Sequence, residues 1–89
     1  MLEQAITIIN KLGLHARAAG KLVETTSRFS CDITIDKDGR NVDGKSIMAM
    51  MMLAASKGTE IIIKTNGEDE AAALEAIVNL INNRFDEEE

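Results

Sequence analysis

The chain has 89 residues, a formal net charge of −5 and 45% hydrophobic residues, with two aromatic side chains, one histidine and one cysteine. This length predicts a single domain over residues 1–89. A single cysteine excludes an internal disulfide, and one cysteine with one histidine cannot complete a metal site. The sequence has no basic stripe and little aromatic surface, which argues against nucleic-acid binding. It also has no apolar run near the ~20 residues that a membrane span needs, which argues against membrane insertion.

The beginning of the chain predicts a strand followed by a helix. Residues 4–9 are typical of a strand, with Ile6 and Ile8 on one face. Over residues 16–27, small and apolar side chains recur at helical spacing. Gly20 weakens this helix by roughly 1 kcal/mol relative to alanine, and close packing against the sheet would account for it.

The middle of the chain predicts a hairpin, a short helix and a central strand. Residues 31–36 alternate polar and apolar side chains, and the Asp-Gly pair that follows favours a hairpin in which residues 40–43 return antiparallel. Ser46 is a suitable N-cap for a short helix over residues 47–55. Three consecutive isoleucines make residues 60–65 a central strand, since neither face of it is polar.

The last predicted helix begins at the acidic residues 68–70, which suit the positive end of a helix. Its apolar stripe consists of Leu74, Ile77, Val78, Ile81 and Phe85. Residues 1–67 carry nine Lys and Arg against seven Asp and Glu, whereas residues 68–89 carry one against eight. The first part could therefore attract an acidic partner. The acidic residues 86–89 lie at the negative end of the helix and are predicted to fray.

These elements follow the order β-α-β-β-α-β-α without linkers or repeats. The order predicts the α+β fold class, with a four-stranded, largely antiparallel sheet and three helices on one face, an open-faced β-sandwich.

His15 lies where the first predicted strand gives way to the first helix. The N–H groups of a helix's first turn, here those of Ala16 and Arg17, are free and favour an anion. Arg17 adds a planar, permanently charged group that matches phosphate oxygens. A neutral imidazole nitrogen is a competent nucleophile toward phosphorus. These residues predict a phosphoryl-accepting site, and a histidine that merely ends a loop is the plain alternative.

Two motifs resemble those of the HPr family, the histidine-containing phosphocarriers of the bacterial sugar phosphotransferase system. The run GLHAR at residues 13–17 is similar to the family's active-site signature, and residues 44–53 are similar to its regulatory-serine segment. Their order and spacing match the family, so the resemblance covers nearly the whole chain and implies the HPr-like open-faced β-sandwich. One departure is Ala18, where family members commonly have proline; it points to a less common branch.

By this resemblance, His15 accepts a phosphoryl group from phosphorylated enzyme I, which draws it from phosphoenolpyruvate, and passes it to an enzyme IIA domain in sugar uptake or its regulation. Arg17 and the backbone amides of Ala16 and Arg17 would hold the phosphate. We expect a co-substrate of larger enzymes and not an enzyme, without a cofactor, monomeric and cytoplasmic. Alternatives are a nitrogen-related or regulatory branch that acts in signalling, and a protein-binding adaptor that has no need of His15.

Ser46 has a structural and a regulatory interpretation. As an N-cap, its hydroxyl accepts a hydrogen bond from a free N–H of the short helix. The resemblance implies instead a substrate of an ATP-dependent HPr kinase/phosphorylase. A phosphate at this helix start would be stabilised locally while adding negative charge beside the partner-binding surface.

A rival motif spans residues 39–46 and matches the phosphate-binding pattern G-x-x-x-x-G-K-[ST] at every fixed position. It would make the chain a nucleotide binder. However, Val42 and its neighbours are predicted to form a returning strand, and no apolar strand that ends in aspartate follows to hold magnesium. We therefore do not expect a nucleotide site.

Spacing on the short helix predicts that Met50, Leu53 and Ala54 are buried and that its other face is an exposed apolar patch near His15. Exposed methionines adapt to several partners in turn, although all of these side chains could instead belong to the core. By resemblance this surface binds enzyme I and enzyme IIA. The predicted partner-binding residues are Gly20, Lys21, Glu24, Ile47, Met48, Met51 and Met52.

Overall fold

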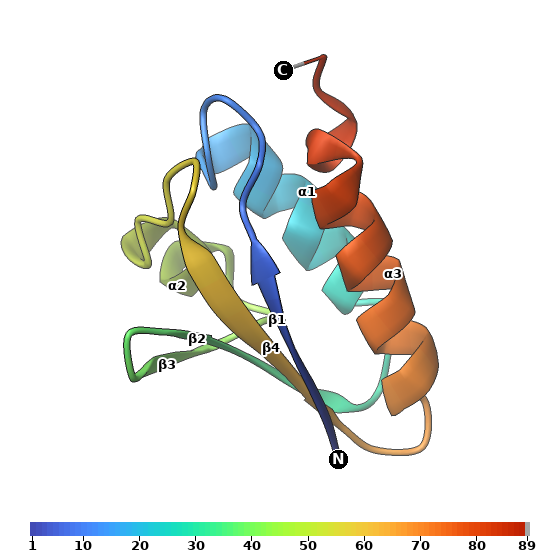
Figure 1. The fold of residues 1–89 in the computed structure, drawn as a ribbon. Coiled ribbons are helices and arrows are strands. Elements are labelled where there is room, and N and C mark those ends of the chain that lie inside the picture. Colours follow the sequence, from blue (N-terminus) through green and yellow to red (C-terminus); the bar gives the residue numbers. More distant parts are fainter. Residues whose placement is uncertain (89) are drawn as a thin grey trace.

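The computed structural model describes residues 1–88 (Figure 1). Four strands form one antiparallel sheet in the order β1-β4-β2-β3. Helices α1 and α3 lie side by side against one face of it, and α2 packs against α1 (Figure 1). The elements are β1 (Leu2–Thr7), α1 (Ala16–Thr26), β2 (Asp32–Lys37), β3 (Arg40–Asp43), α2 (Ile47–Met52), β4 (Glu60–Asn66), α3 (Glu70–Asn82) and a short turn η1 (Arg84–Asp86). The predicted α+β open-faced sandwich is confirmed.

Strand β4 is central, as its isoleucines predict, because it pairs with β1 on one side and β2 on the other. Ile61 and Ile63 are buried beneath the helices, and Ile62 is half-buried on the opposite, open face. The predicted hairpin is also present. Asp38 and Gly39 connect β2 to β3 with φ of 53° and 83°, as a tight two-residue turn requires.

The core lies between the sheet and the helices and is built mostly from aliphatic side chains, with Cys31, Met50 and Phe85. On α3, Ile77 and Ile81 are fully buried, while Leu74 and Val78 are half-buried at the edge. Phe85 is fully buried too, but α3 ends at Asn82, so the predicted helical stripe is wrong at this position. Residues 84–86 instead form a left-handed turn, with φ of 55°, 53° and 63°.

Four further predictions are wrong in detail. Helix α2 ends at Met52 and not near residue 55, because Ala54 has a φ of 54°, and its side chain is exposed instead of buried. Helix α3 begins at Glu70, two residues later than predicted. Gly20 does not pack closely on the sheet: a Cβ there would lie 3.7 Å from Ile47 Cδ1 on α2, which is an ordinary contact.

The longest helix of the described chain is α3, with 13 residues. Across residues 1–88, helices fall short of the length and apolar character that crossing a membrane requires.

Candidate functional site

His15 is the residue that precedes the first turn of α1. Its backbone is extended, with φ of −79° and ψ of 179°, and its carbonyl accepts a hydrogen bond from the Ala19 N–H at 2.8 Å. That hydrogen bond is the first of the helix, so the N–H groups of Ala16, Arg17 and Ala18 have no acceptor within α1. The start of α1 contains no acidic residue. The structure therefore places the imidazole beside free backbone donors and the positive end of a helix dipole.

The loop before His15 is fixed from two sides. The Leu14 N–H donates to the Ala55 carbonyl at 2.8 Å, and the Leu14 side chain is buried. The buried Asn10 side chain donates from Nδ2 to the Gly13 carbonyl at 2.7 Å. Gly13 has a φ of 67°, and a Cβ there would lie only 2.7 Å from the Ala55 oxygen. This close approach explains why glycine precedes the Leu-His pair.

Glu87 contacts His15 from the other end of the chain. Its Oε2 lies 2.5 Å from His15 Nε2, and its Oε1 accepts from Asn10 Nδ2 at 2.9 Å. The pKa of Glu87 is lowered, chiefly by the Asn10 hydrogen bond and also by the hydrogen bond to His15 and the charges of His15 and Arg17. Sequence reasoning did not identify Asn10 or Glu87 as part of this site.

Residues 85–87 of the acidic tail, for which fraying from residue 86 stays a prediction, make contacts with the rest of the domain. Phe85 is buried, its carbonyl accepts from Lys21 Nζ at 3.0 Å, and the same ammonium lies 3.5 Å from the Asp86 carboxylate. Glu87 is held by Asn10 and His15. Residue 89 lies outside the described residues. Lys21, which was predicted to bind partners, is therefore already engaged in holding the tail.

A hollow of about 520 Å³ lies next to His15. Lys11, Leu12 and Arg17 line one part of it, and Asp86, Glu87 and Glu88 line the rest. Arg17 is exposed, so its guanidinium can reach an anion that is bound at the start of α1. The three carboxylates outnumber the two cationic side chains in this hollow, so the case for a phosphoryl site rests on Arg17 and the start of α1 and not on the charge of the hollow.

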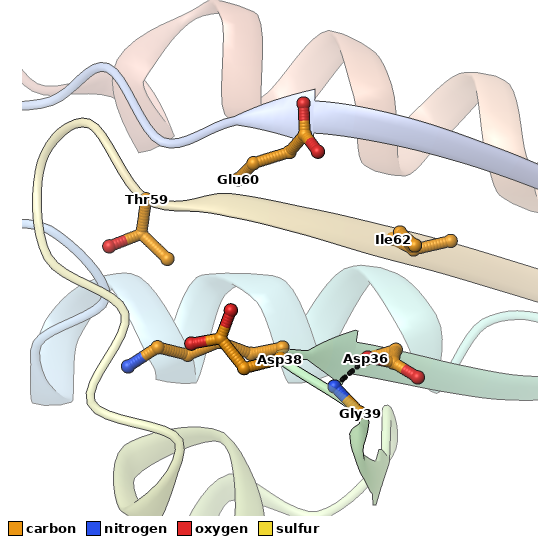
Figure 2. A pocket seen from close by; sticks show the side chains of 7 residues that line it. Asp36, Asp38, Gly39, Thr59, Glu60 and Ile62 are labelled. Carbon is orange, nitrogen blue, oxygen red and sulfur yellow. Dashed lines mark hydrogen bonds between the residues drawn. The ribbon is translucent and has the colours of Figure 1, made fainter.

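A second hollow, of about 470 Å³, is lined by residues of β2, β4 and their adjoining turns (Figure 2). Asp36, Asp38 and Glu60 contribute three carboxylates, and Asp36 also accepts from the Gly39 N–H at 2.9 Å. Lys37 lines it as well, but its ammonium donates to the Leu53 and Ala54 carbonyls. An anion would therefore be repelled here, and this hollow is not a second phosphate site. Among residues 1–88, no group of three His, Cys, Asp or Glu side chains could hold a metal ion.

The exposed face of α2 matches its prediction. Ile47, Met48, Met51 and Met52 are 41%, 66%, 43% and 61% exposed, whereas Met50 and Leu53 are buried. The alternative in which all these side chains belong to the core is wrong. Since α2 packs against α1, the four residues form an apolar patch, here called the α2 patch, beside the helix that begins after His15. On α1, Gly20 is half-buried against Ile47, and the exposed Glu24 lies 3.6 Å from Arg28.

Ser46 caps α2 as predicted, because its Oγ accepts from the Ala49 N–H at 3.2 Å. The preceding residues do not form a phosphate cradle. Four of them make up strand β3, and Lys45 Nζ donates to the Phe29 carbonyl at 2.7 Å. The match to the nucleotide-binding pattern is thus a strand followed by a helix cap.

A family model described as "PTS HPr component phosphorylation site" matches residues 2–83. The phosphocarrier protein HPr of Pseudomonas aeruginosa is 60% identical over 85 residues, which cover 94% of each chain. That of Neisseria meningitidis is 54% identical over 89 residues and 100% of both chains. A crystal structure of HPr from Thermoanaerobacter tengcongensis superposes with a TM-score of 0.97 at 45% identity over all of both chains. Another structure, an HPr dimer from that organism, gives a TM-score of 0.79 at 45% identity, covering 98% of this chain and 100% of that one.

Proposed function

This chain belongs to the HPr family of phosphocarrier proteins, and on that premise we propose that His15 is the residue that carries the phosphoryl group. One observation carries the proposal. His15 lies at the start of α1, beside the N–H groups of the first helical turn and the exposed Arg17. A phosphoryl group on the imidazole would meet the helix dipole and the guanidinium together.

The transfer step uses the ring nitrogen that Glu87 leaves available. Because Nε2 is paired with the Glu87 carboxylate, the lone pair of Nδ1 is the one free to attack phosphorus. The N–P bond to His15 forms while the bond between phosphorus and the donor group breaks, and the donor keeps that electron pair. The proton on Nε2 stays in place, so the phosphorylated ring becomes positively charged beside Glu87. Arg17 and the amides of Ala16 and Arg17 bind the equatorial phosphate oxygens.

We further propose that phosphorylated enzyme I, charged from phosphoenolpyruvate, is the donor and that enzyme IIA domains are the acceptors. The protein is then a monomeric, cytoplasmic co-substrate of these enzymes and uses no cofactor. The α2 patch, with Gly20, Lys21 and Glu24 of α1, forms the docking surface; its exposed methionines suit several partners. A nitrogen-related or regulatory role would use the same His15 chemistry with a different acceptor.

Ser46 is a second proposed phosphorylation site, for an HPr kinase/phosphorylase. Its hydroxyl is half-buried at the start of α2 and bonded to the Ala49 N–H. A phosphate there would place new negative charge next to the α2 patch.

Intact-mass measurement after incubation with enzyme I and phosphoenolpyruvate tests the proposal. The wild-type protein should gain one acid-labile phosphoryl group, and His15→Ala should remain folded and gain none. Arg17→Ala should fold normally and exchange the group at least about tenfold more slowly, since a charged hydrogen bond to the phosphate is worth roughly 1.5–3 kcal/mol. Phosphorylation of His15→Ala by enzyme I would refute the assignment. Transfer from the wild-type protein to sugar-specific or nitrogen-related IIA domains then separates the two branches.

A further inference from the structure

We propose that Glu87 is a positioning residue that keeps the His15 ring in its Nε2–H tautomer and thereby presents the Nδ1 lone pair to phosphorus. This inference rests on the proposed phosphocarrier function of His15. It assigns a role in the transfer to the end of the chain, far in sequence from the active-site motif.

The pair geometry sets the position of the ring proton. Glu87 Oε2 lies 2.5 Å from His15 Nε2, within hydrogen-bonding distance. An ionised carboxylate only accepts, so the proton of a neutral ring must be on Nε2. The lowered pKa of Glu87 keeps that carboxylate ionised at neutral pH. Within residues 1–88, the structure gives Nδ1 no hydrogen-bond partner, and the His15 side chain is 26% exposed.

A buried amide holds the carboxylate in place. Asn10 is fully buried, and its Nδ2 donates to Glu87 Oε1 and to the Gly13 carbonyl. One side chain therefore fixes both the carboxylate and the loop that ends in His15. Metal-bound and catalytic histidines are commonly oriented by a carboxylate in the same way. Loss of the carboxylate partner of a metal-bound histidine costs roughly 10–100-fold, and we expect the lower end of this range for the partly exposed pair here.

The backbone that leads to Glu87 is unfavourable by itself. Residues 84–86 all have positive φ, and none is glycine. Each left-handed residue costs roughly 1–2 kcal/mol. Burial of Phe85 and the hydrogen bond from Lys21 Nζ to its carbonyl offset that cost. The tail thus has a built conformation that ends with its carboxylate on the imidazole.

The same carboxylate affects the product of the transfer. When Nδ1 carries the phosphoryl group and Nε2 keeps its proton, the ring is cationic and lies against Glu87. This charge pair stabilises the phosphorylated form from the side opposite the new N–P bond. Removal of the carboxylate should therefore lower both the rate of acceptance and the phosphorylated fraction at equilibrium.

Three variants test this role. Glu87→Ala removes the hydrogen-bond acceptor, and Glu87→Gln keeps an acceptor oxygen but removes the negative charge. Glu75→Ala, at an exposed position of α3, is the control because it changes the net charge by the same amount as Glu87→Ala. Ring nitrogen NMR shifts at a pH where His15 is neutral report its tautomer. Single-turnover acceptance from phosphorylated enzyme I reports the rate. Thermal unfolding followed by circular dichroism confirms that each variant folds.

In the wild-type protein and in Glu75→Ala, we expect the Nε2–H tautomer alone and equal rates. Glu87→Ala should show a mixed tautomer population and accept the phosphoryl group about tenfold more slowly. Glu87→Gln should keep the tautomer and react at an intermediate rate. An unchanged tautomer in Glu87→Ala would overturn the inference, as would a faster reaction, which would make Glu87 a cover that partners displace. If enzyme I does not phosphorylate the wild-type protein, the proposed function fails, while the NMR measurement still decides the role of Glu87.

Discussion

Replacement of Gly13 by alanine should destabilise the fold much more than the same replacement at Gly39. Both glycines have a left-handed backbone, with φ of +67° and +83°. Alanine is strained in that region by roughly 1–2 kcal/mol, and the lost freedom of the unfolded chain offsets roughly 0.4–1 kcal/mol of this. The backbone contribution is therefore similar at the two positions, and Gly39→Ala is a matched control.

The two sites differ in the space around the added methyl group. At residue 39 nothing lies within 4 Å, but at residue 13 the new Cβ would lie 2.7 Å from the Ala55 oxygen and 2.8 Å from Ser56 Cα. The Ala55 oxygen cannot retreat without loss of its 2.8 Å hydrogen bond from the Leu14 N–H. Overpacking of this kind costs roughly 1–3 kcal/mol. We expect a loss of about 1 kcal/mol for Gly39→Ala and about 2–4 kcal/mol for Gly13→Ala.

Urea unfolding followed by circular dichroism measures both values, provided that the two variants keep the wild-type dependence on urea concentration. Gly13→Ala should also accept the phosphoryl group more slowly than Gly39→Ala, because the loop that it displaces ends in His15. Equal free energies of unfolding in the two variants would show that the left-handed backbone alone matters and that the contact with Ala55 does not position the loop.

Three further predictions concern regulation, docking and pH. Ser46→Asp should reduce phosphoryl transfer from enzyme I at low salt while the midpoint of thermal unfolding changes little; equal kinetics would contradict the regulatory role. Met48→Asp should impair transfer with both partners at little cost in stability, because this side chain is exposed, and an unfolded variant would place it in the core. Asp69→Asn should destabilise the protein at neutral pH, because backbone N–H groups of Ser30 and Cys31 donate to the Asp69 carboxylate and lower its pKa from 3.8. The difference in the free energy of unfolding between Asp69→Asn and the wild-type protein should be fully present above the pKa that Asp69 has in the unfolded chain. It should vanish as the pH falls through the lower pKa of Asp69 in the folded protein. Urea unfolding at a series of pH values measures this difference.

The sequence predicts the fold because its signals are local and agree with one another. The Asp-Gly pair determines the turn between β2 and β3. The three isoleucines of β4 predict a central strand, and β4 does pair with a strand on each side. The position of His15 before a helix also follows from contiguous residues, whereas its phosphoryl-carrying role follows from the resemblance of residues 13–17 and 44–53 to the HPr family. The exposed face of α2 likewise follows from spacing within one helix.

The missed features depend on contacts between distant residues. Glu87 and His15 are 72 positions apart, and an acidic tail gives no sign of which imidazole it will contact. The left-handed turn around Phe85 lacks the glycine that usually indicates such a backbone, and so does Ala54 after α2. Each conformation is imposed by tertiary packing, which overrides the local preferences on which prediction relies.

The central position of β4 also constrains the order in which the protein can be made and folded. Strand β1 has its ladder partner some sixty residues later in the chain, at Glu60–Asn66, and β2 needs the same strand on its other side. While the ribosome has yet to release β4, both earlier strands therefore present unpaired edges, which can join those of neighbouring chains. The four-stranded sheet cannot be completed before β4 has been synthesised. Chains that stop before β4 should therefore aggregate more readily than chains that include it.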